Sequence, residues 1–179
     1  VVLSGGSVKC WGANNDGQLG DGTTTDSPTP VAVSGISTAT SVATGDTHAC
    51  AVLSAGTLRC WGLNHLGQLG NGTTNDSLLP VAVSGISTAT SLVAGSAHTC
   101  AVLKVGDVRC WGWNAWGELG DGTLYDSSTP VAVVFPTTPF TDIAGSPFKP
   151  DIEWVYTEGI TSGCTATAYC PDGYVTREQ

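Results

Sequence analysis

The sequence repeats itself with a period of 50 residues, and this feature constrains the fold more than any other. The triplet that begins at Cys10 (Cys-Trp-Gly) returns at Cys60 and again at Cys110. Residues 1–50 and 51–100 are identical at 32 of 50 positions without a gap. A period of 20–50 residues is typical of solenoids, propellers and arrays, in which each copy packs against its neighbours.

Each copy contains a short hairpin whose loop sets the pairing of its strands. Between Cys50 and Cys60, two strand-like runs flank a three-residue loop that ends at Gly56. A three-residue hairpin loop favours glycine at this left-handed position. The loop predicts that Val52 faces Leu58 and that the two cysteines face each other. Because side chains alternate between the faces of a strand, these four residues share one apolar face.

The rest of each copy predicts further short strands and turns. Runs that begin at Pro30 and Ser41 have strand composition, with the proline at a strand start. Residues 1–133 show no helical periodicity. About four short strands per copy is typical of one β-propeller blade. We therefore predict an all-β partial propeller of about two and a half blades, each of four short antiparallel strands.

Two long motifs carry a resemblance to a known family. One is Trp61-Gly-x-Asn-x-x-Gly-Gln-Leu-Gly-x-Gly-Thr, and the other is Gly95-x-x-His-x-Cys-Ala-Val-Leu. Together they resemble the regulator-of-chromosome-condensation repeat, over residues 1–133. The family forms a seven-bladed propeller, so the resemblance implies part of a larger ring. A start in mid-hairpin without a signal peptide predicts that an amino-terminal part is missing.

The period fails after Val133. Residues 134–139 form a proline-bearing linker, and residues 140–179 resemble a partial S-layer-homology module with a small α-helical part. The matching pieces are Phe140-Thr-Asp, Glu158-Gly-Ile-Thr-x-Gly and Pro171-Asp-x-x-Val-Thr-Arg. The resemblance implies attachment to a cell-wall polymer, with Arg177 contributing to that binding.

Seven cysteines without C-x-x-C spacing favour disulfides and an oxidising compartment over zinc. The hairpin register predicts two bridges, and the loop before Pro171 predicts a third. The predicted pairs are Cys50–Cys60, Cys100–Cys110 and Cys164–Cys170. The periodic partner of Cys10 would fall just before Val1, which predicts a free, reactive thiol. We expect an extracellular or bacterial-type cell-surface location.

Composition argues against several classes of function. Six Lys and Arg residues in a chain of net charge −9 cannot form a nucleic-acid surface. No apolar run approaches the roughly 20 residues of a membrane span. His48 and His98 recur at the same repeat position, which predicts a structural role for both. His65 is predicted to be a solvated loop residue. The segment Asn14-Asn-Asp-Gly fits a calcium loop poorly. We expect no catalytic set, metal or cofactor.

The positions that vary between copies indicate where a partner binds. Three tryptophans recur at the same position and are predicted to pack inside blades: Trp11, Trp61 and Trp111. Three aspartates, each followed by serine, are predicted turn caps: Asp26, Asp76 and Asp126. Other loop positions change toward large apolar residues, and these form our candidate binding set: Leu63, Leu66, Trp113, Trp116, Leu124 and Tyr125. Such loops on a fixed scaffold are typical of a protein-binding surface; the alternative is drift in exposed loops.

Four hypotheses of function follow. The first is a surface-displayed scaffold that binds a protein or glycan through its loops and a cell-wall polymer through its last module. The second is a secreted inhibitor of the β-lactamase-inhibitory type, which would need no wall attachment. The third is a guanine-nucleotide exchange factor, which the cysteine pairs disfavour. The fourth is a propeller hydrolase or lyase, for which the sequence offers no acid, base and nucleophile.

Overall fold

The structure is a computed structural model, and residues 1–135 are described here. The chain divides into two units, Val1–Val134 and Phe135–Gln179. Several sequence predictions lie outside the described residues: the helical segment, the Cys164–Cys170 bridge and the role of Arg177. No helix in residues 1–135 is long and apolar enough to cross a membrane.

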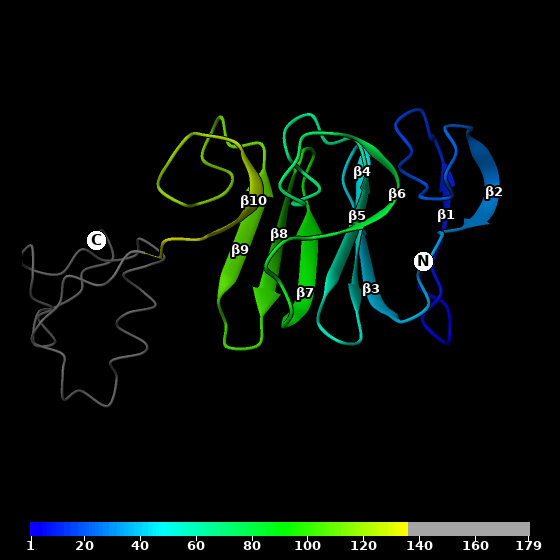
Figure 1. The fold of residues 1–179 in the computed structure, drawn as a ribbon, viewed down its shortest axis with the longest axis horizontal. Coiled ribbons are helices and arrows are strands. Elements are labelled where there is room, and N and C mark those ends of the chain that lie inside the picture. The colour runs from blue at the N-terminus through cyan, green and yellow to red at the C-terminus, as the bar shows by residue number, and fades with distance from the viewer. Residues whose placement is uncertain (136–179) are drawn as a thin grey trace, which may run out of the picture. The chain divides into compact units, whose positions relative to one another are not determined.

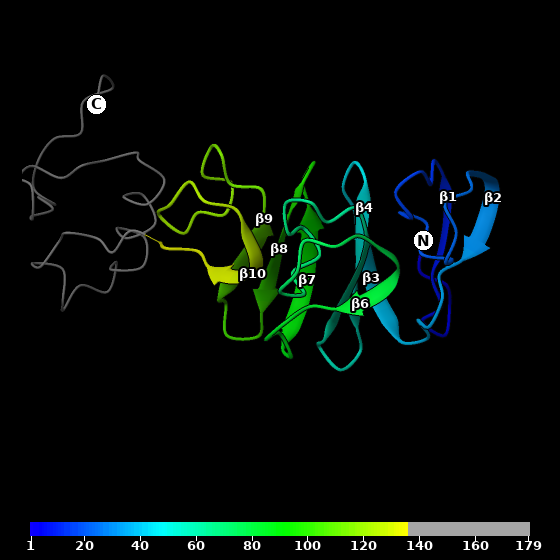
Figure 2. The same ribbon diagram turned by 45° about the horizontal axis from the view of Figure 1, so that its top comes forward.

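The described residues form ten short strands and no helix. Their bounds are β1 Lys9–Gly12, β2 Ser27–Ala32, β3 Ala39–Thr44, β4 His48–Leu53, β5 Leu58–Gly62, β6 Ser77–Ala82, β7 Ala89–Ala94, β8 His98–Leu103, β9 Val108–Gly112 and β10 Ser127–Ala132. They make two four-stranded antiparallel sheets, β3-β4-β5-β6 and β7-β8-β9-β10, and a two-stranded sheet, β1-β2. The sheets stand side by side as successive blades (Figures 1 and 2).

These sheets are called the first blade (β1-β2), the second blade (β3 to β6) and the third blade (β7 to β10). A single bridge between Val2 and Val8 adds to the first blade. Two complete blades and one partial blade match the predicted two and a half. Each complete blade is a meander, in which consecutive strands pair in chain order.

The hairpin register is the one that the loop predicts. Cys50 faces Cys60 and Val52 faces Leu58 in the second blade. Gly56 ends the loop with φ of 79°, a conformation that glycine adopts without the steric cost of a side chain. The third blade repeats this pairing around its own loop. The prediction of register from loop length is therefore confirmed.

Two strands, β2 and β3, begin earlier than predicted. β2 starts at Ser27 rather than Pro30, so that Pro30 lies inside the strand. β2 bonds only to β1, which leaves one edge unpaired and lets a residue without an N–H occupy the strand. The inner strand β3 likewise begins at Ala39, two residues before the predicted start.

The hydrophobic core lies between blades as well as within them. One face of the β4-β5 hairpin packs toward the third blade, where Cys50, Val52 and Leu58 join Trp111 in one buried cluster. The other face packs toward the first blade, where Ala51 and Trp61 join Val8. Both faces of the second blade are thus buried against its neighbours.

Candidate functional site

The recurring tryptophans connect neighbouring blades. The Trp61 ring packs against the first blade, and its Nε1 donates a hydrogen bond of 2.9 Å to the backbone oxygen of Gln18. Trp111 makes the same 2.9 Å bond to the oxygen of Gln68. A Cβ on Gly70 would lie 2.7 Å from Nε1 of Trp111, so only glycine permits this approach. We call these contact regions the first seam, between the first and second blades, and the second seam, between the second and third.

This arrangement corrects the prediction that all three tryptophans pack inside blades. Trp61 and Trp111 are fully buried, but they lie in the seams. Trp11 is 51% exposed. No blade before β1 covers this side chain among the described residues. The same residue at the same repeat position is therefore buried or exposed according to whether a neighbouring blade covers it.

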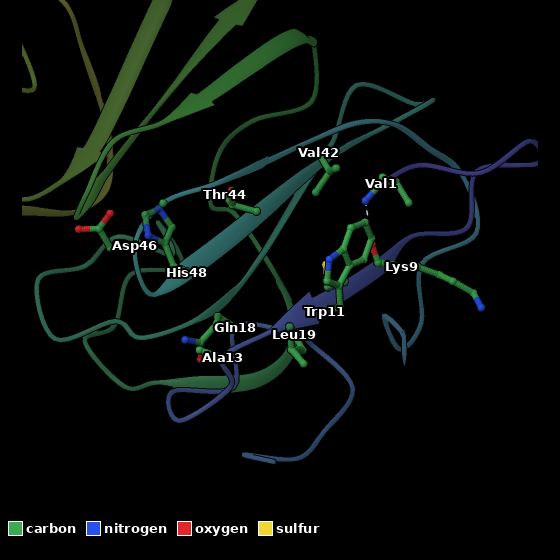
Figure 3. A pocket seen from close by; sticks show the side chains of 12 residues that line it. Val1, Lys9, Trp11, Ala13, Gln18, Leu19, Val42, Thr44, Asp46 and His48 are labelled. Atoms are coloured by element: carbon green, nitrogen blue, oxygen red, sulfur yellow. Dashed lines mark hydrogen bonds between the residues drawn. The ribbon is translucent and has the colours of Figure 1, made fainter. Parts of the chain in front are cut away.

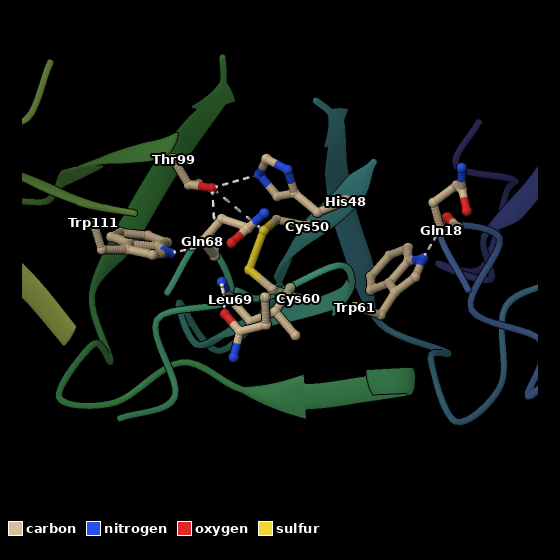
Figure 4. Close-up of a disulfide and its surroundings, with 10 residues drawn as sticks. Gln18, His48, Cys50, Cys60, Trp61, Gln68, Leu69, Thr99 and Trp111 are labelled. Atoms are coloured by element: carbon tan, nitrogen blue, oxygen red, sulfur yellow. Dashed lines mark hydrogen bonds between the residues drawn. A yellow bond between two sulfur atoms is a disulfide. The ribbon is translucent and has the colours of Figure 1, made fainter. Parts of the chain in front are cut away.

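A chain of buried hydrogen bonds crosses the second seam (Figure 4). Nε2 of His48 lies 2.9 Å from the Thr99 hydroxyl, which donates a 3.2 Å bond to the backbone oxygen of Gln68. The hydroxyl has one hydrogen and gives it to the carbonyl. Both contacts are satisfied together only if His48 carries its proton on Nε2 and donates it to Thr99.

The same site disfavours a charged imidazole. The pKa of His48 is lowered from 6.5 to about 4, chiefly by burial and also by the neighbouring His98, while Asp46 opposes these effects. His48 is 1% exposed, and its Nδ1 has no partner among the described residues. A structural role fits this geometry, because the imidazole is neutral, enclosed and engaged with the next blade.

The structure contains two of the predicted disulfides, Cys50–Cys60 and Cys100–Cys110, each within one hairpin. Cys10 is the free cysteine of residues 1–135. It is half-buried, and burial raises the pKa of its thiol. Burial thus disfavours the thiolate form, and the reactivity of Cys10 stays a prediction.

Cys10 also borders a pocket of about 330 Å³ between β1 and β3 (Figure 3). Trp11, Leu19 and Val42 supply apolar walls, and His48 lines the side next to the second blade. In the second blade, the corresponding place beside Cys60 is filled by β4, which carries Cys50. The pocket thus lies in the place that β4 occupies in the second blade. Among the described residues, its lining forms no functional site separate from the residues already discussed.

Three loops follow the ends of β1, β5 and β9, and we call residues 13–26, 63–76 and 113–126 the blade loops. Each is closed by one fully buried asparagine. In the third loop, Asn114 donates through Nδ2 to the backbone oxygens of Thr123 and Tyr125, and its Oδ1 accepts from the N–H of Leu119. Asn14 and Asn64 make equivalent bonds.

The repeated aspartates complete this closure, although not as predicted. Asp26, Asp76 and Asp126 each accept a 2.7 Å hydrogen bond from the backbone N–H of the loop asparagine, 12 residues earlier. They join the two ends of a loop and do not cap a local turn. The asparagines were absent from our candidate residues. Their strict recurrence 12 residues before an aspartate was the signal that could have revealed them.

The candidate binding residues lie on the blade loops, but they differ in exposure. Trp116 is 82%, Tyr125 81% and Leu124 65% exposed. Leu63, Leu66 and Trp113 are half-buried. The three most exposed of these candidates all belong to the third loop.

Comparison between the loops shows where this exposure comes from. The positions equivalent to Leu124 and Tyr125 are exposed in all three loops. Trp116 corresponds to Leu66, which is half-buried because the second loop packs against β10 of the third blade. No blade covers the third loop among the described residues. Leu124 and Tyr125 are exposed because of their position in the loop. Trp116 is exposed partly because no further blade covers the third loop among the described residues.

A meander of four strands, repeated with buried seams and loops on one end, defines a β-propeller of short antiparallel blades. The model of the regulator of chromosome condensation (RCC1) repeat matches residues 5–52, 55–102 and 106–147, and the chain belongs to this family. A second model of the same repeat matches residues 39–68 and 89–117. Residues 139–179 match the S-layer homology domain.

Solved structures show the same fold. The chain is similar to Prp20p from Saccharomyces cerevisiae, with 23% identity and a TM-score of 0.63 over 74% of this chain and 35% of that one. It is similar to human WBSCR16, with 26% identity and a TM-score of 0.67 over 82% of this chain and 37% of that one. The chain thus spans about a third of these structures. No match was found among curated protein sequences.

Proposed function

We propose that this chain is a non-catalytic binding scaffold at a bacterial-type cell surface. Its blade loops engage a protein or glycan partner, and its S-layer homology domain attaches to a cell-wall polymer. One observation carries the first half: large exposed side chains stand on loops whose backbone is fixed by buried asparagines. Rigid, exposed aromatic residues bind partners at low cost in conformational entropy.

The extracellular setting is supported by the cysteines and by the last domain. Two hairpins carry disulfides, which persist in oxidising environments. The match at residues 139–179 supports attachment to the wall. The proposal assigns no reaction to the chain. In its support, His48, the most buried histidine, is engaged by Thr99 inside the second seam.

Co-sedimentation with purified bacterial cell walls tests the attachment. We expect the full chain to pellet with the walls and a chain truncated after residue 139 to remain in the supernatant. Arg177→Ala should weaken sedimentation, and Lys104→Ala, on a hairpin turn of the third blade, is the matched control. Equal sedimentation of the full and truncated chains would remove the wall-attachment half of the proposal.

A further inference from the structure

Charged residues are segregated between the two ends of the blades. We define the loop face as the three blade loops with the turns 45–47 and 95–97, which lie at the same strand ends (Figure 1). The loop face has no Lys or Arg and eight carboxylates: Asp16, Asp21, Asp26, Asp46, Asp76, Glu118, Asp121 and Asp126. The hairpin half of the blades carries four cations and Asp107; the cations are Lys9, Arg59, Lys104 and Arg109.

The two charge sets do not neutralise each other. A strand of five residues, such as β5, extends about 16 Å at 3.3 Å per residue. The Debye length at physiological ionic strength is about 8 Å, so cations at the hairpin end are largely screened from the loop face. Hydrogen bonds from the Thr123 backbone and hydroxyl lower the pKa of Asp121, which is ionised at neutral pH. The loop face therefore presents a strong negative potential to a partner.

Three large exposed side chains with apolar character lie on the third blade loop, within this negative face. They are Trp116, Leu124 and Tyr125, all more than half exposed. Asn114 draws the two arms of the loop together, and a Cβ on Gly117 would lie 3.8 Å from Leu124. The Glu118 carboxylate accepts a 2.9 Å hydrogen bond from the Trp116 backbone N–H. The Glu118 carboxylate is thus held at the backbone of an exposed tryptophan, on a loop of fixed shape.

We propose that the loop face docks a positively charged segment of a partner protein, with Trp116, Leu124 and Tyr125 as the contact patch. The inference rests on the proposed function, because it names the partner chemistry for the same loops. Faces of Trp and Tyr rings attract Lys and Arg side chains, and the carboxylates around them steer and orient a cationic partner. A neutral glycan gains no net electrostatic attraction from eight carboxylates, and an anionic polymer is repelled by them.

The second loop supplies matched residues for a test. It carries Leu66, Thr74 and Asn75 where the third loop has the contact patch, and Gln68 and Asn71 where the third has Glu118 and Asp121. Asn71 makes the same bonds to Thr73 that Asp121 makes to Thr123. Substitutions from one loop to the other therefore keep the loop closure. The patch variant is Trp116→Leu with Leu124→Thr and Tyr125→Asn; the charge variant is Glu118→Gln with Asp121→Asn.

The test is selection of phage-displayed random peptides on the full chain, followed by affinity measurement of the selected peptides. We expect these peptides to be enriched in Lys and Arg. Their affinity should fall about tenfold on each variant at low salt, and the loss on the charge variant should shrink at high salt. A Lys104→Ala chain, altered at the hairpin end, should bind the peptides as the unaltered chain does.

Other outcomes overturn the inference. Selected peptides without positive charge that still depend on Trp116 would leave the loops as a binding site and remove the cationic partner. Peptides that bind the patch variant unchanged, or the absence of any binder that depends on Trp116, would remove the docking site itself. Binding of an oligosaccharide array without cationic peptides would assign the patch to glycans. The cell-wall experiment tests the attachment half of the proposed function independently of these results.

Discussion

The two seams share their tryptophan and backbone contacts and differ in their buried side-chain hydrogen bonds. In both, a buried tryptophan donates to a backbone oxygen of the preceding blade loop. The second seam adds the bonds of His48 and Thr99, and a bond from the Ser96 hydroxyl to Asp46. In the first seam, Ala49 occupies the position of Thr99, and Gln18 is half-buried beside the pocket. Gln68 is fully buried.

This difference distinguishes the contacts that both seams have from those that the second seam adds. Both seams have the tryptophan contact and equivalent backbone hydrogen bonds, from Gly22 to Leu78 in the first and from Gly72 to Ser128 in the second. The polar chain belongs to a seam in which inner strands are present on both sides. The tryptophan contact and the backbone bonds are therefore common to blade stacking, and the buried side-chain bonds depend on local context.

The largest expected effect is loss of a seam tryptophan. Trp111→Ala removes a fully buried ring, and we expect the free energy of unfolding to fall by about 3–5 kcal/mol. For Trp61→Ala we expect a loss in the same range. Trp11→Ala, the control, should cost about 1 kcal/mol because half of its ring is already exposed. Urea unfolding of the full chain measures all three. An equal loss for Trp11→Ala would contradict the assignment of these residues to seams.

Acid should weaken the second seam through His48. The unfolded imidazole binds a proton below pH 6.5, whereas the folded one does so only below about 4. The stability that His48 contributes is therefore complete above pH 6.5 and is lost as the pH falls toward 4. The full loss is about 3 kcal/mol.

His48→Gln provides the comparison for this pH effect. Urea unfolding from pH 7.5 to 4 should show a steeper decline for the natural chain than for the variant, because carboxylate protonation acts on both. Parallel curves would show that the second seam does not discriminate against a charged imidazole.

Removal of a disulfide should have an effect of similar or smaller size. Each bridge closes a loop over a sequence separation of 10 residues. For the Cys50→Ala, Cys60→Ala double variant, we expect a loss of about 2–3 kcal/mol. Cys10→Ala, which breaks no bridge, should change the free energy of unfolding by about 1 kcal/mol or less. Non-reducing peptide mapping should recover both bridges and a Cys10 thiol; Cys10 bridged to another cysteine would contradict the hairpin register.

The smallest expected effect concerns the rim of the second seam. Ser96→Ala removes the 2.6 Å hydrogen bond to Asp46, and we expect a loss of about 0.5–1 kcal/mol. Ser91→Ala on β7 is exposed and should have no measurable effect. If both variants unfold as the natural chain does, the polar chain of the second seam contributes only through its buried members.

The repeat architecture could be predicted because it depends on local rules. Loop length and a left-handed glycine set the hairpin register, and the period set the number of blades. Trp11 could not be predicted from its own copy, because its burial depends on a neighbouring blade. The partner of Asp26 lies 12 residues away across a loop, so local turn chemistry could not identify it. Variation between the copies predicted the exposure of Leu124 and Tyr125. The exposure of Trp116 depends on which blade lies next to its loop, and this could not be predicted from that variation.

The spacing of the seam contact has a consequence for how genes of this type change length. Each seam tryptophan bonds to a carbonyl 43 residues earlier, which is less than one period of 50. An in-phase deletion or duplication of 50 residues therefore leaves every remaining tryptophan 43 residues from an equivalent carbonyl. Unequal recombination between repeats can add or remove whole blades while each new junction reproduces an existing seam. Shifts out of phase with the period would place a different residue at that carbonyl and would break the seam.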